Sequence, residues 1–129
     1  MKMTGISLAA LKQGNLELVE FDYFDGYRTI ELTQKTKTVN GITFPARSIV
    51  YSTDVGDVLI IGNLDASLNV LAPHGAKMVN PSQIINTKRI KFITRIKGTR
   101  NYSAFMDDGS IVTITGDRIK GLEHLIRDD

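Results

Sequence analysis

The stretch YSAFMDDGSIVTIT, residues 102–115, decides the fold class, because it has the pattern of two strands joined by a tight turn. Tyr, Phe, Val, Ile and Thr supply the aromatic and β-branched side chains that favour strands on both sides of Asp108-Gly109. An Asp-Gly pair accommodates the positive φ angles of a two-residue hairpin turn. We therefore predict a β-hairpin in which residues 102–106 pair with residues 111–115.

The same signal occurs at Asp25-Gly26 and Asn40-Gly41, and a polar turn at 54–57 separates two more β-rich runs. The strands predicted around these three turns are residues 21–24 and 27–32, residues 36–39 and 42–44, and residues 48–52 and 58–61. The predicted fold class is mostly β, a β-rich α+β module with a compact antiparallel sheet and two or three short helices.

The helices are predicted from apolar spacing and capping residues. Leu64, Leu68 and Leu71 recur at i, i+4 and i+7, with Asn63 or Asp65 as the cap and Pro73 as the stop. A weaker helix is expected over residues 7–13, ending at Gly14. The third is a C-terminal helix opened by Thr115 or Asp117, with its apolar face formed by Ile119, Leu122, Leu125 and Ile126.

Residues 88–100, KRIKFITRIKGTR, hold six basic residues and no acid. A strand that buries the isoleucines and Phe92 of this segment while projecting cations builds a positive surface on a rigid element, which suits phosphate. Cations also decorate solvent faces and protect sheet edges, so charge by itself leaves a structural role open. The six cations are Lys88, Arg89, Lys91, Arg95, Lys97 and Arg100.

Composition limits the class of protein. The chain has 129 residues, 42% of them hydrophobic, and we predict a single domain over residues 1–129. Cysteine is absent from the sequence, which excludes disulfides and Cys-based zinc sites and makes a reducing cytoplasm the expected location. The aliphatic run at 58–61 is far shorter than the ~20 residues of a membrane span, and the N-terminus does not fit a signal peptide. We therefore expect no membrane partner.

The sequence offers little for catalysis. His74 and His124 lie in a Pro-His-Gly turn and a short charged segment, where exposed surface positions are expected. Turn geometry accounts for Asp107-Asp108 before a glycine. The glycines do not have the spacing of a phosphate-binding loop, and no serine lies in a nucleophile elbow. We expect a protein that is not an enzyme, with no cofactor, no metal and no small-molecule substrate.

The order of the segments resembles the LytTR-type DNA-binding domain of bacterial transcription regulators. The resemblance begins with the strand ending Ile49-Val50-Tyr51, the polar turn and a second strand, followed by the Leu-rich helix. It continues with the phrase NPSQIINTKRI at 80–90 and closes with the Asp108-Gly109 hairpin and Ile114-Thr115. It covers residues 42–126 as a LytTR-like core, which leaves residues 1–41 as an N-terminal helix and hairpin extension.

The resemblance implies a β-rich module that reads double-stranded DNA through loops and strand ends in successive major grooves. Carried over by position, the contacts lie in the loop 54–57, the segment 80–82 and the turn 115–118. The basic segment would neutralise phosphates and release counterions, with three or four cations in contact at once and modest affinity. The candidate contacts besides the six cations are Asp57, Asn80, Ser82, Asn101, Thr115 and Arg118.

The sequence departs from the family pattern at three points. Asn80-Pro81 stands where the family has a basic residue, and Thr115-Gly116 stands where it has Ser-Arg, so base readout there loses the bidentate contacts of an arginine. The strand hairpin after residue 61 is cut short by the helix. These residues hold no receiver domain, so we expect any phosphorylation control to come from another chain.

An alternative function is a non-catalytic interaction or assembly module of similar fold without DNA contacts. The acidic segment LELVEFDYFD, residues 16–25, would then offer Phe21, Tyr23 and Phe24 on an edge strand to a partner such as a second copy of the chain, a homodimer. The simpler interpretation of that segment is a hairpin strand with one buried face.

The direction of the cations separates the two functions. Lys88, Arg95, Lys97 and Arg118 on one surface with the 54–57 loop would favour DNA, whereas scattered cations would favour assembly. Alanine at Lys88 and Arg89 together should weaken binding to all DNA sequences by a few kcal/mol at most, as for phosphate contacts.

Overall fold

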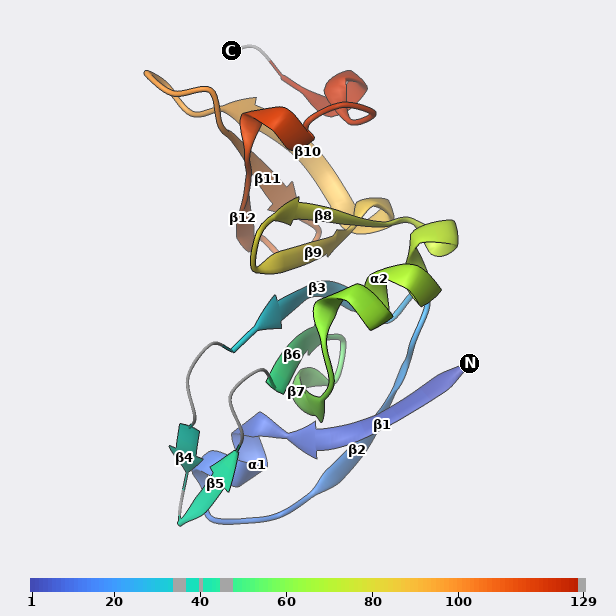
Figure 1. Cartoon of the computed structure of the whole chain (residues 1–129), viewed down its shortest axis with the longest axis vertical. Helices are drawn as coiled ribbons and strands as arrows, with labels where there is room; N and C mark the ends of the chain where they lie inside the picture. The colour runs from blue at the N-terminus through green and yellow to red at the C-terminus, as the bar shows by residue number, and fades with distance from the viewer. Residues whose placement is uncertain (34–36, 40, 45–47, 128–129) are drawn as a thin grey trace.

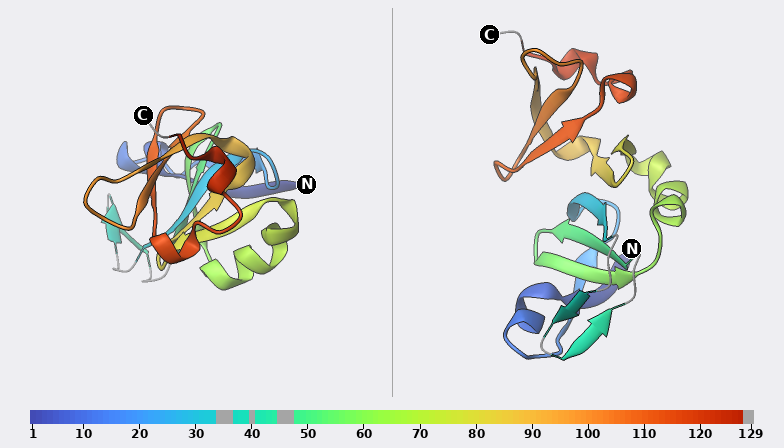
Figure 2. Two further views of the ribbon diagram at one scale, coloured as in Figure 1. Left: turned by 90° about the horizontal axis from the view of Figure 1, so that it is seen from above. Right: turned by 60° about the vertical axis from the view of Figure 1, so that its left-hand side comes forward.

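The computed structural model describes residues 1–33, 37–39, 41–44 and 48–127. Two antiparallel sheets follow one another along the long axis of the molecule (Figure 1). A large sheet has seven strands and a small sheet has three. Figure 2 shows the same two-part arrangement from two other directions, with helix α2 (Leu64–Leu71) on one flank.

The strand bounds follow from the spatial order in each sheet. The large sheet consists of β2 (Leu18–Asp22), β1 (Lys2–Ser7), β7 (Gly56–Ile61), β6 (Ser48–Thr53), β3 (Tyr27–Leu32), β9 (Gln83–Asn86) and β8 (Ala76–Asn80). The small sheet consists of β10 (Ile90–Arg95), β11 (Tyr102–Met106) and β12 (Ile111–Ile114). A separate pair is formed by β4 (Lys37–Val39) and β5 (Ile42–Phe44).

Helices are few and short, so the predicted β-rich fold class is confirmed. Besides α2 there is one α-helix, α1 (Leu8–Lys12), among the described residues. The remaining helical turns are of the 3₁₀ type: η1 (Ala72–His74), η2 (Thr87–Arg89), η3 (Gly116–Arg118) and η4 (Glu123–Leu125). Within the described ranges no helix combines the length and hydrophobicity that a bilayer crossing requires.

Two hydrophobic cores form, and the β8–β9 hairpin lies between them. The first core packs the large sheet against α2 and includes Tyr27 and Leu71, both fully buried. The second core lies under the small sheet around Ile93. Neighbouring side chains of a strand point to opposite faces, so Ile84 enters the first core and Ile85 the second. Apolar contacts on both faces of this hairpin therefore hold the two sheets together.

Three of the predicted strand pairs are present. β11 pairs with β12, β6 with β7 and β4 with β5, all antiparallel. Gly109 and Gly56 adopt the positive φ angles that their turns require, +86° and +98°. In the third pair, Thr36 and Asn40 lie outside the described residues, and the paired strands are Lys37–Val39 and Ile42–Phe44.

The hairpin predicted at Asp25-Gly26 is wrong. β2 pairs with β1, and β3 pairs with β6 and β9. The chain does turn there, because Asp22 Oδ1 accepts the Phe24 N–H at 3.1 Å and the Asp22 carbonyl accepts the Gly26 N–H at 2.8 Å. Gly26 does not adopt a positive φ, and the turn sends the next strand to a different place in the sheet instead of back along β2.

The two N-terminal helix predictions are confirmed. Asn63 caps α2 by accepting the Ala66 N–H at 2.8 Å, and the chain continues from α2 into η1, which contains Pro73. Ser7 caps α1, and Gly14 follows that helix with φ +86°.

The predicted C-terminal α-helix is wrong, because the two 3₁₀ turns η3 and η4 take its place. Gly121 between them has φ +92°, which interrupts a right-handed helix. The apolar residues still serve the core: Leu122 is buried, and Ile119, Leu125 and Ile126 pack against it. The periodicity therefore marked a buried face without marking a helix.

Candidate nucleic-acid interface

The basic segment is divided by the structure between two ends of β10. Lys88 and Arg89 lie in η2 before the strand, whereas Lys97 and Arg100 lie in the loop after it. Of the apolar side chains expected to be buried here, Ile93 is fully buried; Ile90, Phe92 and Ile96 are partly exposed.

Residues 96–101 form an ordered loop between β10 and β11 at the far end of the small sheet. The Ile96 N–H donates to the Asn101 carbonyl at 3.0 Å, which closes the loop. The Thr99 hydroxyl donates to the Ile96 carbonyl at 2.9 Å and accepts the Asn101 N–H at 3.0 Å. These bonds hold Lys97 and Arg100, both exposed, on a fixed backbone.

The turn 115–118 packs against this loop. The Gly116 N–H donates to Asn101 Oδ1 at 3.2 Å. Thr115 binds the other side, since its N–H and its hydroxyl donate to the Val79 carbonyl at 2.9 and 3.2 Å. The turn is therefore held between the β10–β11 loop and the end of β8.

The β8–β9 turn completes the same surface. Asn80 Nδ2 donates to the Thr113 carbonyl at 3.0 Å and to Gln83 Oε1 at 2.8 Å. Asn80 Oδ1 accepts both the N–H and the hydroxyl of Ser82 at 3.1 Å. The Asn80 amide is thus committed to holding the turn and β12, and Pro81 is exposed beside it.

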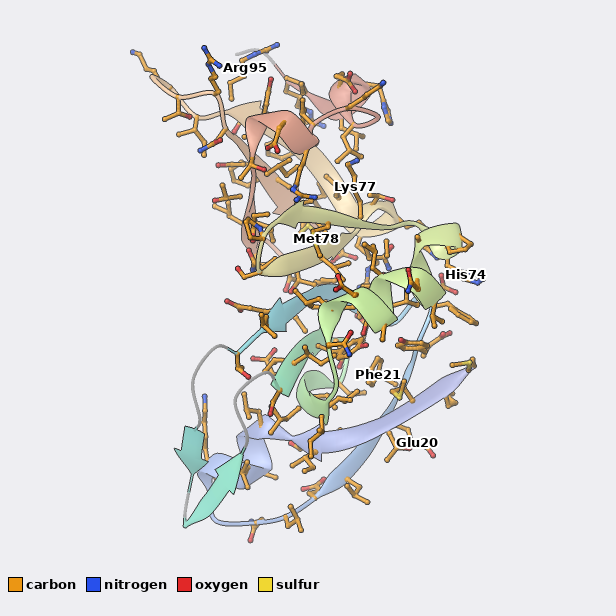
Figure 3. The ribbon with its side chains drawn as sticks, in the orientation of Figure 1. Glu20, Phe21, His74, Lys77, Met78 and Arg95 are labelled. Atoms are coloured by element: carbon orange, nitrogen blue, oxygen red, sulfur yellow. The ribbon has the colours of Figure 1, made fainter. Side chains whose placement is uncertain are left out.

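We call the surface made by the 96–101 loop, the turn 115–118, the β8–β9 turn and the end of β10 the apical surface. Figure 3 shows Arg95 at this end of the molecule. Two open hollows flank the loop, one beside Arg100 and Gly116 and the other beside Lys97 and Arg127. The predicted contacts brought together here are Asn80, Ser82, Arg95, Lys97, Arg100, Asn101, Thr115 and Arg118.

Two arginines and two aspartates form a closed ring of ion pairs at the opposite end of β10. Arg89 binds Asp54 through Nη2 and Oδ1 at 2.7 Å and Asp107 through Nε and Oδ2 at 2.5 Å. Arg28 binds the same two carboxylates, with Nη2 to Asp54 Oδ1 at 3.0 Å and Nε to Asp107 Oδ1 at 2.7 Å. This charge ring ties β3 and the 54–57 turn of the large sheet to η2 and the 107–110 turn of the small sheet.

The ring keeps its carboxylates ionised. Hydrogen bonds from Arg89 hold the pKa of Asp54 below its usual range. Burial raises the pKa of Asp107, but hydrogen bonds from Arg89 and Arg28 outweigh this effect and the pKa lies below its usual range. The pKa of Arg89 is raised, first by its hydrogen bond to Asp54. The two arginines are 14% and 17% exposed, so the ring is partly shielded from water.

The remaining predicted contacts lie near the ring or along β10. Lys88 forms an ion pair with Asp25. Lys91 is exposed on β10, and Asp57 is exposed on β7 opposite Ser52. Lys88 and the 54–57 turn therefore lie at one end of β10, and Arg95 and Lys97 at the other. The four cations of the sequence criterion do not share one surface with that turn.

Sequence reasoning missed the partners of Arg89. Arg28 was not singled out, and Asp107 was explained by turn geometry. The contacts Arg28–Asp107 and Arg89–Asp54 span 79 and 35 residues, so no local spacing reveals them. The hints available were an unpaired-looking acid at each of two turns and an arginine early in a strand. Both histidines are exposed as expected, and the His74 ring stacks on Phe24 with centroids 4.0 Å apart.

Comparison with known proteins gives one informative result. No family model matches the sequence, and no curated protein matches it. A solved structure matches with a TM-score of 0.68 at 13% sequence identity, covering 96% of this chain and 94% of that one. It is the LytTR DNA-binding domain of a Bacillus cereus protein described as a methyl-accepting/DNA response regulator. The match extends well beyond residues 42–126. The chain therefore has the fold of a LytTR-type DNA-binding domain over almost its whole length.

Proposed function

We propose that the chain binds double-stranded DNA through the apical surface, as a module of a bacterial transcription regulator acting in the cytoplasm. The observation that carries the proposal is the ordered 96–101 loop, which presents exposed cations beside two hollows on a LytTR-type fold. A rigid cationic loop suits a polyanion because its charges are positioned before binding and little side-chain order remains to be lost.

Phosphate contacts supply most of the affinity in this proposal. Lys97 and Arg100 neutralise backbone phosphates and release counterions, with Arg95 at the end of β10 beside them. Arg118 extends the same cationic surface on η3. Three or four such contacts give modest, salt-sensitive binding, and they set the position of the protein on the duplex rather than its sequence preference.

Polar groups around the cations are assigned to base edges and sugar-phosphate oxygens. The hydroxyls of Ser82 and Thr115 donate within the protein, which leaves oxygen lone pairs to accept from a base amino group. Asn101 uses Oδ1 on Gly116, so its amide hydrogens face the ligand role. Asn80 acts by holding the β8–β9 turn in place.

Lys88 and Arg89 are assigned a supporting role, because their side chains already bind carboxylates of the protein. An alanine at Arg89 leaves Asp54 and Asp107 without one of their two arginines, so weaker DNA binding of that variant would report on the fold as well as on phosphate contact. Lys91 and Asp57 stay as outlying contacts, with Asp57 limited to accepting from a base because its charge repels phosphate.

The test compares two double variants with the same loss of charge. Lys97→Ala with Arg100→Ala removes two cations from the apical surface, and Lys2→Ala with Lys12→Ala removes two exposed cations from β1 and α1 at the far end of the molecule. We expect the first pair to weaken binding to a labelled duplex at least tenfold and the second to leave it within about twofold. Equal effects would mean that net charge alone attracts DNA and that the apical surface is not the interface.

The assembly function keeps one specific observation in its favour. β2 is an edge strand of the large sheet, and Leu16 and Leu18 near it are each 68% exposed. Figure 3 shows Glu20 on the same strand. Phe21 and Tyr23, which the sequence offered to a partner, are buried in the first core instead. A second copy would set acids of β2 against acids, so this edge favours a partner strand that carries cations.

Sedimentation of the protein across a range of concentrations checks the self-association form of this alternative. A monomer at every concentration, with intact DNA binding, would exclude the homodimer as the functional unit of the DNA-binding module.

A further inference from the structure

The hollow beside Arg100 has the composition of a base-reading site, and its geometry depends on Gly116. A Cβ built on Gly116 would lie inside contact distance of the Arg100 carbonyl oxygen and 3.2 Å from the Arg100 Cβ. The nearest obstacle is backbone, which cannot swing away as a flexible side chain does. Gly116 does not have a positive φ, so glycine is required here by close approach and not by backbone handedness.

This close approach positions Arg100. The Gly116 N–H binds Asn101 Oδ1 on one side of Arg100, and the Thr99 hydroxyl fixes the backbone on the other side. The Arg100 side chain is exposed and has no ion pair within the part of the chain that the structure describes. It therefore starts from an anchored Cα with its guanidinium available to a ligand, in contrast to Arg89, whose guanidinium is occupied by carboxylates.

The same hollow contains an acid. Asp117 lines it together with Arg100, Asn101 and Thr115. A carboxylate is unfavourable in a site that binds only phosphate, because the two anions repel each other. Beside a base pair it is useful: arginine donates two hydrogen bonds to O6 and N7 of guanine, and aspartate accepts from the N4 amino group of cytosine. An arginine next to an aspartate thus matches the two halves of a G·C pair in the major groove.

We propose that Arg100 and Asp117 read a G·C base pair and that Gly116 is the residue that lets the loop carrying Arg100 dock beside Asp117. The inference rests on the proposed DNA-binding function and adds a base and two reading residues to it. Lys97, on the other side of the loop, makes a phosphate contact and carries no sequence information.

The experiment selects duplexes from a random pool with the wild-type protein and then measures variants on a selected duplex and on one with the G·C pair inverted. Arg100→Lys keeps the charge but loses the planar fork, so we expect it to lose about tenfold or more in preference for the selected duplex while its salt dependence stays unchanged. Lys97→Ala serves as the matched control, and it should weaken both duplexes about equally. Replacing the guanine by 7-deazaguanine, which lacks the N7 acceptor, should weaken the wild type and leave Arg100→Lys unaffected.

The outcomes separate the two proposals. Wild-type binding with no selected G·C pair, or a preference that Arg100→Lys retains, would overturn the reading role while DNA binding stands. Loss of preference in Arg100→Lys with unchanged preference in Asp117→Asn would overturn the role of Asp117. Failure of the wild type to bind any duplex would overturn the proposed function and the reading role with it.

Discussion

Gly116 illustrates how a single residue fixes the apical surface. Its close contact with the Arg100 backbone predicts that Gly116→Ala forces the 96–101 loop and the 115–118 turn apart, since neither backbone segment has room to yield. We expect a loss of about 1–3 kcal/mol in the free energy of unfolding, as for other overpacked sites.

Gly62→Ala is the matched control, because a Cβ there meets the Ile49 side chain at an ordinary 3.5 Å and Gly62 does not have a positive φ. Urea denaturation should show a change within about 0.5 kcal/mol for Gly62→Ala. Equal stability of the two variants would contradict the close-approach explanation of Gly116.

Asn86 has a structural role that its place in the sequence phrase does not reveal. It is fully buried, its Nδ2 donates to the Tyr27 carbonyl at 3.1 Å, and its Oδ1 accepts the Lys88 N–H at 3.2 Å. Asn86→Ala leaves a buried carbonyl without its donor, so we expect the free energy of unfolding to fall by about 1–3 kcal/mol. Asn15→Ala, at an exposed loop position, should change it little in the same urea titration.

At the scale of elements, the charge ring ties turns of the two sheets together by ion pairs. The folded-state pKa of Asp54 and of Asp107 lies below the unfolded value near 3.9. The ring therefore contributes stability above that unfolded pKa, and the contribution is lost as the pH falls through the lower folded pKa.

We expect Asp54→Asn and Asp107→Asn each to lower the free energy of unfolding by about 1 kcal/mol at pH 7, a modest amount because Asp54 is 52% exposed and Asp107 36%. The difference from wild type should shrink below about pH 4, where the wild-type carboxylates take up protons. Asp57→Asn, exposed on β7, is the control. A difference that persists unchanged at pH 3 would show that packing, and not charge, is what those side chains supply.

The elements that the sequence predicted correctly are those with local determinants. The turn at Asp108-Gly109 needs two residues, and α2 needs a cap and leucines one turn apart, so both are visible in the sequence. The partner of β2 is β1, which lies across α1, and nothing near Asp25-Gly26 specifies that choice. The apolar spacing at 119–126 describes burial in the second core, and two 3₁₀ turns around Gly121 satisfy it as well as a helix would.

The candidate site follows the same division. The sequence identified the loop cations, the 80–82 turn and the 115–118 turn, and the structure brings these segments together. It could not show that Arg89 faces Asp54 and Asp107, because those contacts join residues far apart in the chain. Cationic residues that are neighbours in sequence, Arg89 and Lys91, therefore have different environments: one lies in an ion-pair ring and the other is exposed.

At the scale of the whole molecule, the two sheets share the β8–β9 hairpin and present the apical surface at one end of the long axis (Figure 1). The net charge of +2 is too small to attract DNA by itself, so binding must depend on where the cations lie. The large sheet, with its acidic edge strand β2, lies toward the other end. This asymmetry predicts one DNA-facing end and one end that DNA avoids.

The most direct measurement of this account is the affinity of the wild-type protein for a random-sequence duplex as salt is raised. Three or four phosphate contacts predict that the logarithm of the binding constant falls with the logarithm of salt concentration at a slope of about −3. Removing Lys97 and Arg100 together should reduce the steepness by about two. An affinity that stays flat with salt, or a slope that these two substitutions leave unchanged, would contradict DNA binding through the apical surface.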